Sequence, residues 1–401
     1  MSDPFRRSAR VGAVELSEIL TISERAAALK REGRDVITLG TGEPDFPTPA
    51  HVVEAAHRAA LAGETTYTLT VGTIALREAI AAAAGREGGD RPDLAEIIVC
   101  TGAKQVLYNA FAATLDPGDE VLIPAPYWTS YPDIVTVCGG RPVALPTTAA
   151  GGFRITPGQL AAAIGPRTRW LLLNSPSNPA GAVYAPDDLE ALAEVLRAAP
   201  HVGIMVDEIY QHICYVPFRS FRAVAPDLAD RTLIVNGVSK SHAMTGWRIG
   251  WGIGPRRLIA AMLAVQSQIT SGASSVSQAA AVAALEGDRQ FLAERCDDFR
   301  ARRDRLAAAL NATGILDCPS ADGAFYLFPA CAAAFGRSSG RGRRIENDGD
   351  FCEALLEEEG VALVPGRAFG TPGHVRLSYA YSRASLDEAA TRIARFCAEL
   401  R

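Results

Sequence analysis

One lysine stands in surroundings that could make its amine a nucleophile. Lys240 follows an apolar run at residues 232–235 and lies in the polar, glycine-rich stretch GVSKSHAMTGWRIG, residues 237–250. A lysine amine attacks an aldehyde only when it is neutral, and burial near apolar or cationic groups lowers its pKa toward that state. Arg248 could supply the fixed positive charge that a phosphate needs. A lone lysine is usually a solvated surface cation, so the rest of the chain must decide between these two interpretations.

Two further charged residues end or interrupt apolar segments. Asp207 closes the run 202–206, and Arg376 lies inside the run 375–379. Open α/β sheets bind ligands at the carboxyl ends of their strands, so Asp207 is expected beside a ligand. An unpaired guanidinium is costly inside an apolar strand, so Arg376 needs an anion, and its geometry suits a carboxylate. A buried structural ion pair is the alternative for Arg376.

These residues must be positioned by regular elements, and the sequence predicts an α/β arrangement for them. Short β-branched runs alternate with Ala/Leu-rich stretches, two of which, 104–115 and 186–199, have helical spacing. The alternation predicts one largely parallel sheet. Strands are expected at residues 96–100, 120–123, 169–173, 202–206, 232–235 and 248–253.

The pattern of expected helices and strands changes after residue 287. A long charged helix is expected over 289–309, followed by short strands at 325–328, 361–364 and 375–379. This pattern predicts a second, α+β domain. The polar stretch 336–349 is expected to be an exposed loop.

Composition narrows the classes of function. The 401 residues exceed what one core usually organises, and the net charge of −5 gives no sign of a nucleic-acid-binding surface. The eight cysteines form no C-x-x-C pair, the six histidines lack H-E-x-x-H spacing, and no phosphate loop of the G-x-x-x-x-G-K type occurs. With no signal peptide and no long apolar run, we expect a cytoplasmic protein that binds no metal, nucleic acid or membrane.

Residues 237–250 resemble the attachment signature for pyridoxal 5'-phosphate (PLP) in class I aminotransferases, [GS]-x-[GSTA]-K followed by small residues and R-x-[GA]. Further motifs stand in the family's order between residues 39 and 379: GEPDF at 42–46, PYWTSY at 126–131, NPAG at 178–181, DEIY at 207–210 and VRLSY at 375–379. They are most similar to the bacterial aspartate/prephenate/aromatic subgroup. The resemblance implies PLP fold type I, with a mostly parallel seven-stranded sheet in a large domain (48–287) and a smaller α+β domain (1–47 plus 288–401).

The resemblance also implies how PLP is held. Lys240 would carry it as an imine, and Asp207 would pair with the pyridine nitrogen, keeping the ring an electron sink. Trp128 would stack on the ring, and Tyr210 and Asn178 would contact its phenolate oxygen. The strand at 96–100 ends in a turn that opens a helix, where unpaired amides bind phosphate. The remaining cofactor contacts are expected from this turn and from the lysine segment: Gly102, Ala103, Lys104, Ser239 and Arg248.

Two departures from the family pattern bear on these contacts. Ala180 stands where the family often has threonine, and Gly237 replaces a serine that binds phosphate in some members. Phosphate contacts must then fall on Ser239, Arg248 and the Gly102 turn.

By the same resemblance, the substrate carboxylate would be clamped by Arg376 and by the backbone amide of Gly42, beside Trp128 and Asn178. Tyr67 would reach across a homodimer interface to the partner's phosphate. The expected activity moves an amino group between an L-amino acid and a 2-oxo acid, in a ping-pong cycle through pyridoxal and pyridoxamine forms. Lys240 would be the general base at the donor's Cα, and Asp207 and Tyr210 complete the expected catalytic set.

The sequence does not decide which amino acid is the donor, because two residues of opposite charge favour different donors. Lys104 favours an acidic donor, which with an aromatic one is the first choice, whereas a carboxylate at Glu18, in the segment Ser17, Glu18, Ile19 and Leu20, would favour a basic amino acid. A PLP lyase, decarboxylase or oxidase on the same fold is a further alternative. A transcription regulator with an aminotransferase-like domain is disfavoured, because only about 38 residues precede Gly40.

Overall fold

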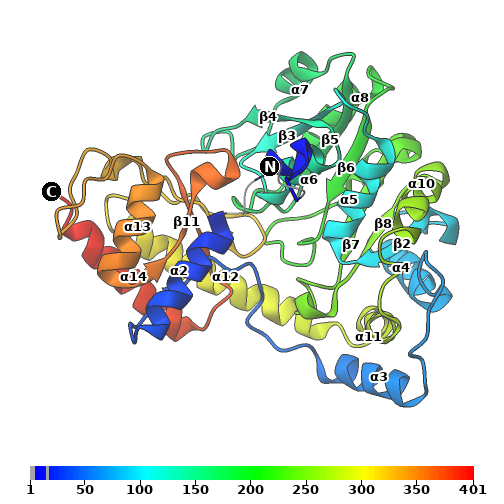
Figure 1. Ribbon diagram of the computed structural model, residues 1–401, viewed down its shortest axis with the longest axis horizontal. Helices are drawn as coiled ribbons and strands as arrows, with labels where there is room; N and C mark the ends of the chain where they lie inside the picture. The colour runs from blue at the N-terminus through cyan, green and yellow to red at the C-terminus, as the bar shows by residue number, and fades with distance from the viewer. Residues whose placement is uncertain (1–4, 15–17) are drawn as a thin grey trace.

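A computed structural model describes residues 5–14 and 18–401 (Figure 1). Its largest element is a seven-stranded sheet with the strand order β2-β8-β7-β6-β5-β3-β4. Neighbouring strands are parallel except at β8, which is antiparallel to both β2 and β7. The strands are β2 (Ile97–Thr101), β3 (Glu120–Ala125), β4 (Arg141–Pro146), β5 (Thr168–Asn174), β6 (Gly203–Asp207), β7 (Thr232–Gly237) and β8 (Ile249–Ile253).

The sheet is buried on both faces because alternate residues of its strands enter two different hydrophobic clusters. In β6, Ile204 and Val206 pack into one cluster while Met205 packs into the other. This two-residue alternation is the geometry of a pleated strand, and it explains why the runs are apolar without interruption. Helices α4, α7, α8 and α11 supply the first cluster, and α5, α6 and α10 supply the second.

The helices of this part of the chain follow the predicted alternation, and both predicted helices, α5 and α8, are present. Pro186 begins α8, and the side chain of Asp188 accepts a hydrogen bond from the backbone N–H of Ala185, which precedes the helix. The helices are α3 (Ala50–Leu61), α4 (Ile74–Arg86), α5 (Ala103–Thr114), α6 (Ser130–Val137), α7 (Pro157–Ala163), α8 (Pro186–Arg197), α9 (Phe221–Val224), α10 (Arg256–Ser267) and α11 (Ser275–Glu286).

A second group of elements has its own core, in which Phe299, Phe325, Phe351 and Phe396 are buried. Strands β9 (Tyr326–Leu327), β11 (Val364–Pro365) and β12 (Val375–Ser378) form an antiparallel sheet, and β1 (Ile37–Thr38) pairs in parallel with β10 (Val361–Ala362). The N-terminal segment therefore joins the C-terminal one. The helices are α1 (Ala9–Gly12), which lies apart against α6, and α2 (Glu18–Arg31), α12 (Gln290–Asn311), α13 (Asp348–Glu359) and α14 (Arg383–Ala398).

The long helix α12 runs between the two groups of elements (Figure 1). The predicted domain boundaries at 47/48 and 287/288 stay a prediction. The predicted loop at 336–349 ends earlier than expected, since Asn347 caps α13 and Asp348 begins it. None of the helices in the described ranges, 5–14 and 18–401, is long and apolar enough to cross a membrane.

Candidate active site

A cleft of about 560 Å³ opens where β5, β6 and β7 end, and the second group of elements closes its other side. Asn174 and Asp207 are the last residues of their strands, so the topology alone brings them to this edge. Eleven residues predicted for the site line the cleft: Gly42, Ala103, Lys104, Trp128, Asn178, Asp207, Tyr210, Ser239, Lys240, Arg248 and Arg376.

Lys240 lies in the turn after β7, with its side chain in the cleft. Its Nζ donates a 2.6 Å hydrogen bond to the carbonyl oxygen of Gly42, which comes from the opposite wall. Burial lowers the pKa of Lys240 to about 8; Glu43 and Asp207 oppose the shift, and Arg248 and Arg376 add to it. A substantial fraction of this amine is neutral near physiological pH, as nucleophilic attack requires.

Asp207 is buried at the floor of the cleft and is held in place from two sides. Its Oδ2 accepts a 2.7 Å hydrogen bond from the hydroxyl of Tyr131, and its Oδ1 accepts one from the backbone N–H of Ile209. Burial raises the pKa of Asp207 to about 6, against the opposing effects of Tyr131, Ile209 and Lys240. Asp207 is therefore ionised at neutral pH, and no cation lies within ion-pair distance of it among the described residues.

The turn before α5 and the segment after Lys240 form a cradle without room for larger side chains. Gly102 has a φ of 83°, and a Cβ there would lie 2.3 Å from Nη2 of Arg248. A Cβ on Gly250 would meet the backbone N of Ala103 at 2.2 Å. Arg248 adopts a left-handed backbone conformation, with φ 56°, and anchors Nη1 on the carbonyl of Thr245. The guanidinium thus faces the first turn of a helix, where unpaired amides bind anions.

Arg376 is 2% exposed and has no carboxylate within 4.0 Å among the described residues. Its Nη1 donates to Oδ1 of Asn178 at 2.9 Å and its Nη2 donates to the carbonyl of Gly40. Its Nε has no hydrogen-bond partner within residues 5–14 and 18–401. The alternative of a structural ion pair is therefore wrong for the described part of the chain, and the cleft holds a buried guanidinium that lacks an anion.

Tyrosines support the same wall of the cleft. The hydroxyls of Tyr210 and Tyr326 lie 2.9 Å apart, and the ring of Tyr326 lies 4.8 Å from the guanidinium carbon of Arg376. A Cβ on Gly42 would fall 2.5 Å from the Tyr326 hydroxyl. Gly42 is therefore required for the close approach of its backbone to this wall.

Trp128 lies two residues before α6 and stands edge-on to Tyr131, with ring centroids 5.3 Å apart. The Nζ of Lys104 lies 4.7 Å from the centre of the Trp128 ring, within the range of a cation–π contact. Burial lowers the pKa of Lys104, and Arg248 adds to the shift while Asp133 opposes it. Like Arg376, Lys104 has no carboxylate within ion-pair distance among the described residues.

Three predicted residues, Gly102, Tyr67 and Glu18, are not among the residues that line this cleft, although Gly102 lies directly before its member Ala103. Tyr67 is 96% exposed and does not line it. Glu18, at the start of α2, pairs with Nε of Arg367 at 3.1 Å, while its neighbour Ile19 reaches the cleft. Ser17, named with them, lies outside the described residues.

Sequence reasoning gave no role to Tyr131, Tyr326 and Gly40. Tyr131 stands three residues after Trp128, so its presence beside the ring site could have been suspected from the helical spacing of α6. The other two are set by the pairing of distant segments, for which one sequence carries no signal.

A strand-end carboxylate, a lysine amine of lowered pKa and an arginine above a glycine turn fit the three polar parts of PLP: ring nitrogen, aldehyde and phosphate. Together with the sheet, they define a fold type I PLP enzyme.

Comparisons with known proteins agree with this class. The profile of the family described as aminotransferase class I and II matches residues 34–393. The chain is 54% identical over 398 residues to an aspartate aminotransferase of Rhizobium meliloti (strain 1021), covering 99% of this chain and 97% of the relative. It is 48% identical over 386 residues to a probable aspartate/prephenate aminotransferase of Rhizobium leguminosarum bv. phaseoli, covering 96% of each.

Solved structures give the same result. The crystal structure of an aspartate aminotransferase from Rhizobium meliloti matches with a TM-score of 0.96, covering 99% of this chain and 100% of that one at 54% identity. An aspartate aminotransferase from Thermus thermophilus, solved with maleate, matches with a TM-score of 0.91 at 42% identity, covering 98% and 99%. The chain belongs to the aminotransferase class I and II family. It is a PLP-dependent aminotransferase that moves an amino group between an amino acid and a 2-oxo acid.

Proposed function

We propose that the preferred amino donor is a dicarboxylic amino acid of the aspartate, glutamate or arogenate type, with a dicarboxylic 2-oxo acid such as 2-oxoglutarate or prephenate as the acceptor. The observation that carries this proposal is the charge of the cleft. Four cationic side chains line it, Lys104, Lys240, Arg248 and Arg376, against only two carboxylates, Glu43 and Asp207.

None of these four cations has a carboxylate within 4.0 Å among the described residues, and since Lys240 is the proposed attachment point of the cofactor, Lys104, Arg248 and Arg376 remain to meet anions. Arg376 is buried and needs a counter-charge, whereas Lys104 and Arg248 are exposed at the cleft and are free to meet anions there, so the cleft suits three anionic groups. The cofactor phosphate accounts for one of them, at Arg248 and the Gly102 turn. An α-carboxylate at Arg376 accounts for the second, and a side-chain carboxylate at Lys104 would account for the third.

Lys240, Asp207, Trp128, Tyr210 and Asn178 would hold the rest of the cofactor. When bound, PLP supplies an electron sink for the charge left at the donor's Cα. The carboxylate of Asp207 holds a proton on the ring nitrogen, because an ion pair in this buried floor favours the protonated form. The amine of Lys240 removes the proton from the donor's Cα as a general base, and its lowered pKa increases the neutral fraction that can do so.

Arg376 orients the donor through its α-carboxylate. Asn178 and Gly40 fix its guanidinium, so the donor's Cα is presented to Lys240 at little further entropic cost. Relatives support the dicarboxylic assignment, since they are named aspartate or aspartate/prephenate aminotransferases and one was solved with maleate, a dicarboxylate. A basic donor loses its support, because the carboxylate of Glu18 is already neutralised by Arg367.

Substitution of Lys104 tests the donor. We expect Lys104→Gln to lower kcat/KM for aspartate and glutamate about 10- to 100-fold, the effect of losing a charge-assisted hydrogen bond. Alanine and phenylalanine should change by less than about threefold, since neither has a side-chain carboxylate. Lys30→Gln, at an exposed lysine of α2, is the matched control. An equal loss for all four donors would contradict the dicarboxylic assignment and place Lys104 with the cofactor instead.

We also propose that the enzyme acts as a homodimer in which Tyr67 completes the partner's site. The support is that exposed apolar side chains lie near Tyr67 in the sequence, with Leu61, Leu69 and Ile74 exposed to 76, 56 and 54%. Mixed dimers of Tyr67→Phe and Lys240→Ala chains test it. The site with an intact lysine then receives Tyr67 from the other chain, so its kcat should return to the wild-type value per intact site. An unchanged, impaired kcat would place Tyr67 in its own subunit's site.

A further inference from the structure

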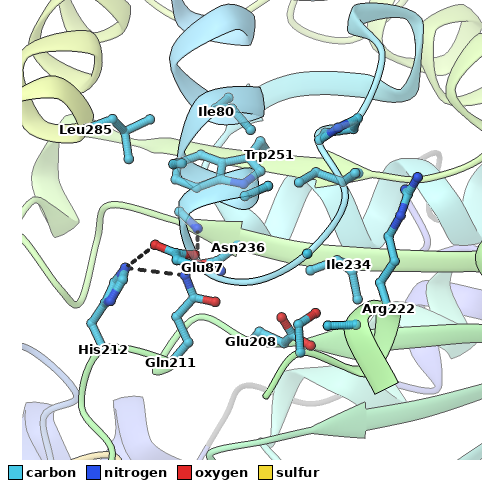
Figure 2. A pocket seen from close by; sticks show the side chains of 18 of the residues that line it. Ile80, Glu87, Glu208, Gln211, His212, Arg222, Ile234, Asn236, Trp251 and Leu285 are labelled. Carbon is cyan, nitrogen blue, oxygen red and sulfur yellow. Dashed lines mark hydrogen bonds and ion pairs between the residues drawn. The ribbon is translucent and has the colours of Figure 1, made fainter. Parts of the chain in front are cut away.

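A second cavity, of about 270 Å³, is shown in Figure 2 and is called the rear cavity below, because neighbours in sequence of the cleft residues line it. Asp207 and Lys240 line the cleft, whereas the next residues, Glu208 and Ser241, line this rear cavity. Successive residues of an extended chain point to opposite sides, which explains the division at Asp207 and Glu208. None of the described residues lines both spaces.

The rear cavity contains a buried carboxylate without a counter-charge. Glu208 is 2% exposed, and its Oε1 accepts a 3.0 Å hydrogen bond from the backbone N–H of Phe221. Within the described ranges no lysine, arginine or histidine nitrogen lies within 4.0 Å of its carboxylate. Burial raises the pKa of Glu208 to about 7, the hydrogen bonds from Phe221 and Ser220 oppose this, and Glu87 and Asp207 add to it.

Other charged side chains of the wall form ion pairs with one another or with nearby residues. Glu87 binds Arg289 at 3.1 Å and His212 at 3.3 Å. Arg222 pairs with Glu96 at 3.1 Å. Among the described residues, the cations His212 and Arg222 of this wall are therefore paired with carboxylates other than Glu208.

The rest of the lining includes apolar side chains, with Ile80, Ile234 and Trp251 among them, and Glu208 lies across the cavity from Trp251 (Figure 2). A carboxylate facing an indole over an apolar lining is the combination that recognises an organic cation.

We propose that the rear cavity binds a small organic cation, a protonated amine on a short apolar skeleton, whose N–H group donates to Glu208. The skeleton packs against Trp251 and Ile234. A simple inorganic cation would leave this apolar lining without a partner, and an anion would meet Glu208 and Glu87. The site does not depend on which amino donor the enzyme uses.

A ligand in the rear cavity should change turnover in the active site. Asn236, Gly237, Ser241 and His242 line the cavity and flank Lys240 on both sides along the chain. We expect an amine packed against this segment to change the position of Lys240 and hence turnover, which would make the amine an effector.

Calorimetry of the holoenzyme tests the site. The probe is N,N-dimethylbutylamine, whose tertiary nitrogen donates one N–H but cannot form an imine with the cofactor. Because burial raises the pKa of Glu208 and a bound cation favours the ionised carboxylate, binding of the protonated amine should release protons at pH 7, measured from the heat in two buffers of different ionisation enthalpy. The neutral analogue N,N-dimethylbutanamide should bind at least tenfold more weakly. Equal or tighter binding of the amide, or no proton release, overturns the assignment to Glu208.

Amine binding to two variants, and kcat of the wild-type enzyme with the amine present, complete the test. Glu208→Gln should lose the amine, whereas Asp90→Asn, at an exposed carboxylate of the same rim, should keep it. If Glu208→Gln does not fold, the amine/amide comparison on the wild-type enzyme decides alone. A saturating amount of the amine should change kcat at least twofold, and an unchanged kcat would overturn the coupling to Lys240.

Discussion

The hydroxyl of Tyr131 donates a 2.7 Å hydrogen bond to Oδ2 of Asp207, and the ring of the same tyrosine stands edge-on to Trp128. One buried side chain therefore orients two of the proposed cofactor contacts. Its hydrogen bond also lowers the pKa of Asp207, against the larger effect of burial.

Tyr131→Phe removes this hydrogen bond and keeps the ring. The pKa of Asp207 should rise above its value of about 6, so the carboxylate becomes protonated at a higher pH than in the wild type. We expect kcat/KM to fall about tenfold at pH 7 and its acid limb to move upward by about one pH unit. Tyr127→Phe is the control, and an acid limb unmoved from wild type would show that Tyr131 does not act through Asp207.

The ionised carboxylate of Asp207 should lower the free energy of unfolding of the cofactor-free protein, although the proposed reaction needs it. Its pKa in the folded protein, about 6, lies above the ordinary 3.8, so the folded state binds this proton more tightly than the unfolded state does. The ionised carboxylate therefore costs stability above pH 6, and the cost disappears below about pH 4. We predict that Asp207→Asn raises the free energy of unfolding of the cofactor-free protein by about 1–3 kcal/mol at pH 7.5.

The same variant should lower kcat by about 1,000-fold or more, because the ring nitrogen loses its anionic partner. Urea unfolding at pH 7.5 and pH 4 measures the stability difference. A variant less stable than wild type at pH 7.5 would mean that Asp207 is neutralised in the cofactor-free protein.

Arg376 should matter equally to every donor. Arg376→Lys keeps the charge but loses the two-pronged geometry fixed by Asn178 and Gly40, so kcat/KM should fall about 100-fold for aspartate, alanine and phenylalanine alike. Steady-state kinetics with the three donors measures it. A loss confined to aspartate would place the side-chain carboxylate, and not the α-carboxylate, at Arg376.

Glu18 is expected to be a structural residue. Its partner Arg367 is 44% exposed in its side chain, and surface pairs of this kind contribute about 0–1 kcal/mol. Glu18→Gln should therefore leave the ratio of kcat/KM for aspartate and arginine unchanged and lower the melting temperature slightly. A rise in the relative rate with aspartate of tenfold or more would return Glu18 to the substrate site.

The sheet was largely predictable because its strands are buried on both faces. Six of its seven strands stand out as uninterrupted apolar runs, and the predicted ends agree with the structure to within about two residues. The seventh, β4, lies at the edge of the sheet, is largely exposed and contains two prolines, so its sequence carries neither an apolar run nor strict alternation.

The site was predictable only in part. Asp207 and Lys240 follow strands directly, so their position at the ligand edge depends on local sequence alone. The partner of Glu18 lies 349 positions away in the chain, and the pairing of Tyr210 with Tyr326 depends on how two groups of elements meet. Such contacts are set by tertiary packing, which leaves no periodic trace in a single sequence.

The proposed chemistry depends most on Lys240 as the residue that carries the cofactor. The small number of lysines in the chain makes this role easy to test. The sequence has only three lysines, Lys30, Lys104 and Lys240, and the last two both line the cleft. Borohydride reduction of the holoenzyme followed by peptide mass spectrometry should place the pyridoxyl group on Lys240 alone, and Lys240→Ala should lose the label and turnover together. A label on Lys104, or unlabelled peptides from an active holoenzyme, would contradict the central claim.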